Sequence, residues 1–196
     1  MKAMQQFVET IKIEDGKALN LNFHQARMER TMRHFFAHTP VPMLSGILSP
    51  TPDMHFYKAR VVYGGQYAPY KMRAIRSLKL IEDNEIDYSF KSTDRACLNR
   101  LTAQKGDCDE VLIVKNGLLT DTSFTNIAVF DGERWLTPKH PLLMGTKRAS
   151  LLERQVIKEA DISVETLMKA QKVSLINAMI DLGEIEITTQ MVNRGL

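Results

Sequence analysis

The fold is decided by residues 110–137, which read EVLIVKNGLLTDTSFTNIAVFDGERWLT. Two apolar runs flank Asn116-Gly117, and this dipeptide between such runs is the strongest short-range signal for a β-hairpin. Asp131-Gly132 is flanked in the same way and predicts a second hairpin. The four strands predicted here cover residues 110–114, 118–122, 126–130 and 134–137.

Outward from this stretch, strands and helices are mixed. Residues 8–13 alternate with a period of two, which predicts a strand, and residues 23–38 carry apolar side chains at roughly helical spacing. Prolines between residues 39 and 53 predict a loop. Because strands and helices alternate without regular βαβ spacing, we expect a mixed α/β (α+β) fold rather than a doubly wound sheet. Further predicted elements are a helix from Ser92 or Thr93 through Ala103, a helix after Gly145 with Leu151, Val156 and Ala160 on its inner face, and strands over residues 173–179 and 184–187.

Length and composition exclude several classes of protein. The chain has 196 residues, 44% of them hydrophobic, and a formal net charge of +3, which is too mild to predict a nucleic-acid partner. Cys97 and Cys108 form neither a disulfide framework nor a zinc signature. No apolar run reaches membrane-spanning length, and the first residues lack the apolar stretch of a signal peptide. We therefore expect a cytoplasmic protein without a membrane partner.

The residues alone leave the chemistry open. His34 and His38 share a helix face, but no third ligand is in view, so surface histidines are the favoured interpretation and no metal is expected. Residues 142–148 run from a loop into a predicted helix, whose first N–H groups can hold a phosphate. An ordinary helix start remains the alternative.

Seven segments gain meaning when they are taken in chain order. Together they resemble the class IV aminotransferases, the fold-type-IV pyridoxal-phosphate (PLP) enzymes. The resemblance implies a two-domain architecture like that of D-amino-acid aminotransferases. It also implies a shortened small N-terminal domain, residues 1–80, and a larger cofactor-binding domain, residues 81–196. The segments are Val8-Glu9-Thr10 before Asp15-Gly16, His24 to Met28, Lys91 to Arg95, Asp121 with Asn126, Asp131-Gly132 before Thr137-Pro138, Leu143 to Arg148, and Asn177-Ala178.

The resemblance assigns the cofactor's aldehyde and phosphate to particular residues. Lys91 is similar to the lysine that forms the Schiff base with the aldehyde, a step that needs its neutral amine. Arg27 corresponds to an arginine that binds the phosphate, and its planar fork suits an oxyanion. The helix start at Gly145, Thr146 and Lys147 completes the phosphate site with backbone N–H groups.

Asp121 stands where the family usually has glutamate, facing the pyridine nitrogen of the cofactor. An anion there keeps the nitrogen protonated and makes the ring a better electron sink. The shorter side chain of Asp121 needs a closer backbone or a bridging water. Asn126 is expected to support the loop beneath the cofactor, although an asparagine that begins a hairpin strand is its structural alternative.

The remaining candidates concern the substrate. Thr10 lies where lyase relatives place a hydroxyl that could relay a proton, and Arg60, Arg95 and Asn177 are candidate substrate-binding residues. Their structural alternatives are a strand threonine, exposed or ion-paired arginines and a turn asparagine.

The resemblance implies a homodimeric enzyme acting on a small amino compound. The expected reaction is that of 4-amino-4-deoxychorismate lyase, which releases pyruvate and 4-aminobenzoate for folate biosynthesis. One alternative is an aminotransferase acting on D- or branched-chain amino acids. Another is a catalytically idle PLP-binding homologue.

Overall fold

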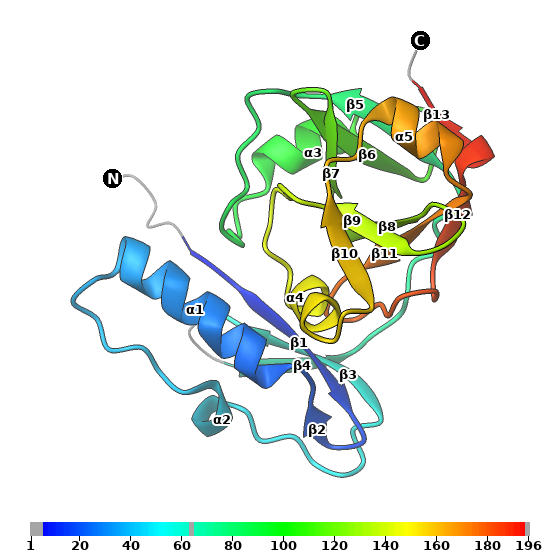
Figure 1. The fold of residues 1–196 in the computed structure, drawn as a ribbon. Coiled ribbons are helices and arrows are strands. Elements are labelled where there is room, and N and C mark those ends of the chain that lie inside the picture. Colours follow the sequence, from blue (N-terminus) through cyan, green and yellow to red (C-terminus); the bar gives the residue numbers. More distant parts are fainter. Residues whose placement is uncertain (1–5, 63–64, 195–196) are drawn as a thin grey trace. The chain divides into compact units, whose positions relative to one another are not determined.

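The structure is a computed structural model that describes residues 6–62 and 65–194. Its contacts divide the chain, drawn as a ribbon in Figure 1, into two compact units. The first unit comprises the residues up to Met72 together with Phe90–Asp94. The second comprises Arg73–Ser89 and the residues from Arg95 onward. By these contacts Lys91 belongs to the first unit, although the sequence-based division at residue 80 assigned its segment to the second domain.

The first unit is an antiparallel sheet with strand order β2-β1-β3-β4, packed against α1. Ile11 and Ile13 of β1 are fully buried with Met28 and Met32 of α1 in one apolar core, and Figure 1 shows α1 running alongside β1. The strand predicted over residues 8–13 is therefore present. The elements of this unit are β1 (Glu9–Glu14), β2 (Lys17–Ala18), α1 (Leu21–Phe35), α2 (Leu44–Ile47), β3 (Phe56–Val61) and β4 (Gly65–Pro69).

The second unit is built on a larger mixed sheet. Its strands follow the order β10-β9-β8-β7-β6-β5-β13, and β11 pairs with both β8 and β12. Asn116 and Gly117 both have positive φ, 52° and 76°, as the two-residue turn between β6 and β7 requires. The elements are β5 (Leu78–Glu82), α3 (Ala96–Thr102), β6 (Glu110–Lys115), β7 (Leu118–Thr122), β8 (Asn126–Phe130), β9 (Trp135–Pro138), α4 (Thr146–Glu153), β10 (Ile157–Ala160), α5 (Val164–Lys169), β11 (Lys172–Ile176), β12 (Glu186–Thr188), the 3-10 helix η1 (Thr189–Met191) and β13 (Val192–Asn193).

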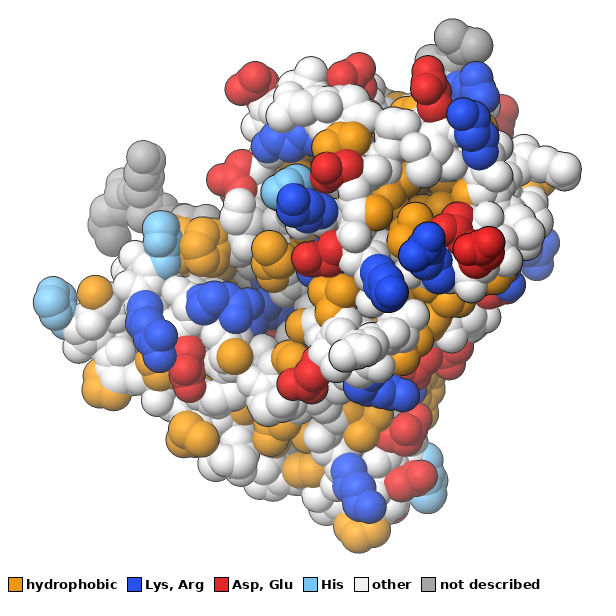
Figure 2. Space-filling model, in the orientation of Figure 1, with side chains coloured by type: hydrophobic (Ala, Val, Ile, Leu, Met, Phe, Trp, Pro, Cys, Tyr) orange, Lys and Arg blue, Asp and Glu red, His pale blue; other side chains and the backbone are white. Residues whose placement is uncertain are grey.

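The mixed α/β fold is confirmed, and several predicted elements need correction. The helix predicted from Ser92 or Thr93 begins at Ala96, because the residues before it form extended chain that pairs with the start of β1. The helix predicted as far as Ala160 ends at Glu153; Val156 lies beyond its end, and Ala160 belongs to β10. A short helix, α2, interrupts the predicted proline-rich loop, and the strand predicted over residues 173–179 ends at Ile176. Figure 2 shows acidic and basic side chains interspersed over the visible face, as the small net charge suggests.

Candidate active site

A buried charge cluster joins β1 to α1 in the first unit. Alternation along β1 turns Glu9, Ile11 and Ile13 toward α1, where His24 and Arg27 lie one helical turn apart. Arg27 Nε and Nη2 donate to Glu9 Oε1 and Oε2 at 2.9 and 2.5 Å. His24 Nδ1 lies 2.6 Å from Glu9 Oε2. The buried Glu9 carboxylate is therefore held by three polar contacts.

The protonation states of this cluster follow from its contacts. Burial raises the pKa of Glu9, but the charge of Arg27 and the hydrogen bonds from His24 and Arg27 outweigh it and lower this pKa to about 2. Burial lowers the pKa of His24 below its ordinary value, although Glu9 opposes that shift. Because ionised Glu9 can only accept hydrogen bonds, His24 donates through Nδ1 and is neutral at pH 7.

The Lys91 segment pairs with the start of β1. Val8 N donates to Lys91 O at 3.0 Å, and Thr93 N donates to Gln6 O at 2.8 Å. Lys91 lines a cavity of about 30 Å³ together with Glu9 and with apolar side chains of α1, of β3 and of the two residues before β1. This space is enough for about one water molecule. The predicted Schiff-base lysine thus lies beside the buried charge cluster.

Thr10 and Arg60 lie directly opposite each other in the β1–β3 pairing. Side chains at such positions share one face of a sheet. Thr10 is half-buried and Arg60 is exposed. Because Glu9 precedes Thr10 on the strand, its side chain occupies the other face. The structure brings Thr10 and Arg60 together, and the sheet separates them from Arg27.

In the second unit, Asp121 of β7 is buried and held from two sides. Its Oδ1 accepts a hydrogen bond from Asn126 Nδ2, and its Oδ2 accepts one from Leu143 N, both at 2.9 Å. Asn126 Nδ2 also donates to Leu143 O at 2.8 Å. Hydrogen bonds to the Asp121 carboxylate therefore link β7, β8 and the loop before α4. The structure brings Asp121 and Asn126 together, as the sequence-based roles require.

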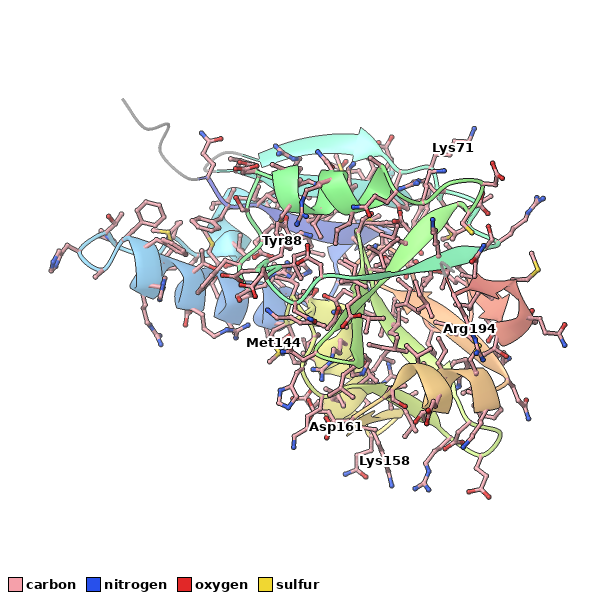
Figure 3. The ribbon with its side chains drawn as sticks, turned by 90° about the horizontal axis from the view of Figure 1, so that it is seen from above. Lys71, Tyr88, Met144, Lys158, Asp161 and Arg194 are labelled. Atoms are coloured by element: carbon pink, nitrogen blue, oxygen red, sulfur yellow. The ribbon has the colours of Figure 1, made fainter. Side chains whose placement is uncertain are left out.

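The start of α4 lies against the same asparagine. A Cβ on Gly145 would come 1.8 Å from Asn126 Oδ1, so only glycine leaves room for that side chain. Gly145 is the N-cap, no side chain caps the helix, and its first turn has no acidic residue. The first N–H groups of a helix lack intrahelical acceptors. Thr146 and Lys147 thus begin a helix suited to an anion. Figure 3 labels Met144, the half-exposed residue just before this start.

The side chains of the first helical turn point to other partners. Buried Lys147 forms an ion pair with Asp181, and Arg148 Nη2 donates to Pro138 O at 2.8 Å and to Glu159 Oε1 at 2.6 Å. The predicted contact of Lys147 with an anion therefore depends on its backbone N–H alone.

Two predicted substrate-binding residues hold the turn between β7 and β8. Arg95 Nη2 donates to Ser123 O at 2.8 Å, and its guanidinium lies 6.0 Å from the ring centre of Tyr88, labelled in Figure 3. Asn177 Nδ2 donates to Phe124 O at 3.3 Å. Each of these side chains thus donates a hydrogen bond to a backbone carbonyl in the turn that follows Asp121.

Sequence reasoning missed the roles of Glu9 and His24. Both lie in segments that carried the family resemblance, but nothing local shows that they meet each other and Arg27. His34, considered above for metal binding, stacks on Phe90 at 4.8 Å between ring centres. In the described part of the chain, no three His, Cys, Asp or Glu side chains gather into a group that could hold a metal. Nor do residues 6–62 and 65–194 contain a helix long and apolar enough to cross a membrane.

The family follows from comparison with known proteins. The pattern of the family "Amino-transferase class IV" matches residues 57–186. The chain therefore belongs to the class IV aminotransferases, as the resemblance predicted, and it is an enzyme of the PLP-dependent class.

Three relatives refine this assignment. An uncharacterized Haemophilus influenzae protein is 37% identical over 185 residues, which cover 90% of this chain and 98% of the relative. The crystal structure of a "putative 4-amino-4-deoxychorismate lyase" from Haemophilus somnus shows 34% identity and a TM-score of 0.85, covering 93% of this chain and 100% of the relative. A "putative amino-acid aminotransferase" from Mesorhizobium loti shows 21% identity and a TM-score of 0.79, with 94% and 99% coverage. This last likeness concerns the fold alone.

Proposed function

We propose that the protein is a PLP-dependent 4-amino-4-deoxychorismate lyase. The reaction breaks the bond between the substrate ring and the enolpyruvyl oxygen, and the ring loses a proton as it becomes aromatic. The products, 4-aminobenzoate and pyruvate, account for every atom of the substrate, so no amino acceptor is consumed. The proposal is carried by the 34% identity to the Haemophilus somnus protein, which this chain matches along its whole length.

The residues present fit PLP. Lys91, which lines a cavity beside the buried charge cluster, suits its aldehyde. The start of α4, which no side chain caps, suits its phosphate, and the buried Asp121 carboxylate suits a protonated pyridine nitrogen. Arg27 uses two N–H groups on Glu9, and a guanidinium has five, so donors remain for a phosphate. When bound, the cofactor supplies an electron sink that stabilises a carbanion.

In this proposal the residues of the first unit bind and move protons. Lys91 supplies the amine that attaches covalently to the cofactor, and once displaced its Nζ accepts the ring proton. The hydroxyl of Thr10 relays a proton to or from the substrate. Arg60, opposite Thr10 on the same sheet face, binds a substrate carboxylate.

In the second unit, Asp121 keeps a proton on the pyridine nitrogen. Asn126 and the N–H of Leu143 hold its carboxylate in place. The backbone N–H groups from Gly145 to Lys147 bind the phosphate. As wider expectations of the same proposal, the enzyme is a cytoplasmic homodimer that serves folate biosynthesis.

Incubating the purified protein with 4-amino-4-deoxychorismate and measuring pyruvate tests this function. A lyase releases pyruvate and 4-aminobenzoate in equal amounts and continues without a keto acid. Pyruvate that appears only when a keto acid is supplied would replace the proposal with transamination of D- or branched-chain amino acids. A protein that binds PLP, turns yellow and acts on neither class would be the idle homologue.

A further inference from the structure

The turn that follows Asp121 is closed tightly. Thr122 N donates to Thr125 O at 2.9 Å, and the two threonine hydroxyl oxygens lie 2.7 Å apart. Asp121 and Asn126 face each other across the base of the turn. Ser123 and Phe124 therefore occupy the tip, and Arg95 and Asn177 hold their carbonyl groups. A side chain attached to this tip has a fixed position relative to Asp121.

Arg73 lies on the ring of Phe124. Its guanidinium carbon is 4.8 Å from the ring centre, a cation–π contact, and its Nη1 is 3.6 Å from Glu110 Oε2. That separation is an ion contact but too long for a hydrogen bond. The Arg73 side chain is 55% exposed, whereas that of Glu110 is fully buried. A planar guanidinium is thus fixed against an aromatic face, and within residues 6–62 and 65–194 no hydrogen bond consumes its donors.

The side chains of the other arginines close to this turn already donate hydrogen bonds to protein groups. Arg95 donates to Ser123 O, and Arg148 is buried between Pro138 O and Glu159. An arginine stacked on a ring keeps its N–H edge open for a two-point contact with a carboxylate. Both products of the proposed reaction carry a carboxylate, so the substrate carries two.

We infer that Arg73 binds a carboxylate of the substrate and that Phe124 holds it ready for this contact. The inference rests on the proposed lyase function. It adds a specificity residue that the sequence analysis did not identify. Arg95, which the sequence suggested for a substrate contact, holds the turn that carries Phe124. Arg73 stacks on the ring of this phenylalanine.

The simpler explanation is that Arg73 only neutralises the buried Glu110 carboxylate. Within the described residues Glu110 Oε2 makes no hydrogen bond, and Arg73 lies in ionic contact with it. A double-mutant cycle separates the two explanations. It needs Arg73→Met, Glu110→Gln and the double variant, all as cofactor-loaded full chains, with thermal unfolding to verify folding. Arg76→Met is the matched control, because Arg76 is exposed and, among the residues that the structure describes, only its backbone N–H is bonded, to Asp109.

Losing a charge-assisted contact should raise the KM for 4-amino-4-deoxychorismate about 10- to 100-fold. We expect this rise for Arg73→Met with little change in kcat, the same rise in the Glu110→Gln background, and none for Arg76→Met. Arg73→Lys should restore part of the affinity. If the effect of Arg73→Met disappears once Glu110 is glutamine, Arg73 serves only that carboxylate and the inference is wrong.

A second readout keeps this test separate from the proposed reaction. Equilibrium dialysis measures the binding of 4-aminobenzoate to the cofactor-loaded protein without turnover. Weaker binding by Arg73→Met than by Arg76→Met supports the carboxylate contact even if the wild type releases no pyruvate, a result that would refute the lyase function alone. Equal binding by the two variants, of pyruvate as well as of 4-aminobenzoate, would overturn the contact.

Discussion

Asn126 occupies the space that any side chain at position 145 would need: a Cβ on Gly145 would lie 1.8 Å from Asn126 Oδ1. The same asparagine donates to Asp121 at 2.9 Å. The glycine before α4 and the carboxylate of β7 are therefore coupled through one side chain. This coupling joins the proposed phosphate site to the proposed partner of the pyridine nitrogen.

Gly145→Ala should weaken PLP binding by displacing Asn126 and with it Asp121. We expect a loss of about 10-fold or more in cofactor affinity, measured by fluorescence titration, because a charge-assisted hydrogen bond is broken. In an Asn126→Ala background, where the obstacle is gone, the same change should have little further effect. Full additivity of the two substitutions would show that they are not coupled.

Lys91→Ala should abolish covalent attachment of the cofactor, since no other amine is expected to replace it. Borohydride reduction followed by peptide mass analysis identifies the modified lysine. Lys71→Ala, at an exposed lysine, is the control and should leave attachment unchanged. A pyridoxyl group on any other lysine of the wild-type protein contradicts the assignment.

Asp121→Asn keeps the size of the side chain and removes its charge. We expect PLP to bind while removal of the substrate proton slows about 10- to 100-fold, because a close charge partner of the ring nitrogen is lost. Exchange of that proton into heavy water measures the step directly. Exchange at the wild-type rate would mean that the carboxylate does not act on the ring nitrogen.

Arg27→Met should destabilise the fold by about 3–5 kcal/mol, because it leaves the buried Glu9 carboxylate without its charged partner. Urea denaturation gives this value. The double variant Glu9→Gln with Arg27→Met should recover part of the loss, since no buried charge is then unpaired. Equal stability of the single and double variants would show that Arg27 does not compensate Glu9.

Stability should fall on acidification in two stages. The unfolded chain protonates His24 near pH 6.5 while the folded chain does not, so unfolding becomes easier as the pH falls below that value. Glu9, with a folded pKa of about 2, contributes stability above about pH 4.5, and this contribution is lost as the pH approaches 2. His24→Gln should flatten the first stage of a pH series of urea unfolding curves; a first stage as steep as that of the wild type would show that His24 does not cause it.

Much of the fold could be predicted because its signals are local. The dipeptides Asn116-Gly117 and Asp131-Gly132 specify turns between neighbouring strands, and backbone preferences within a few residues are enough to form them. The predictions were wrong where a residue distant in the sequence determines the local structure. Ser92 and Thr93 are good helix caps by type, yet they lie in chain that pairs with the start of β1.

The sequence by itself determined most of the element types, the turns and the ordered motifs that assign the chain to its family, because these depend on residue type and spacing. Only the tertiary structure decided which donor meets which acceptor. It paired Arg27 with Glu9 across 18 positions, turned Arg95 to Ser123 O, and set Arg73 on Phe124. The partner of a long polar side chain depends on which elements pack beside it. Spacing along the chain does not specify this partner.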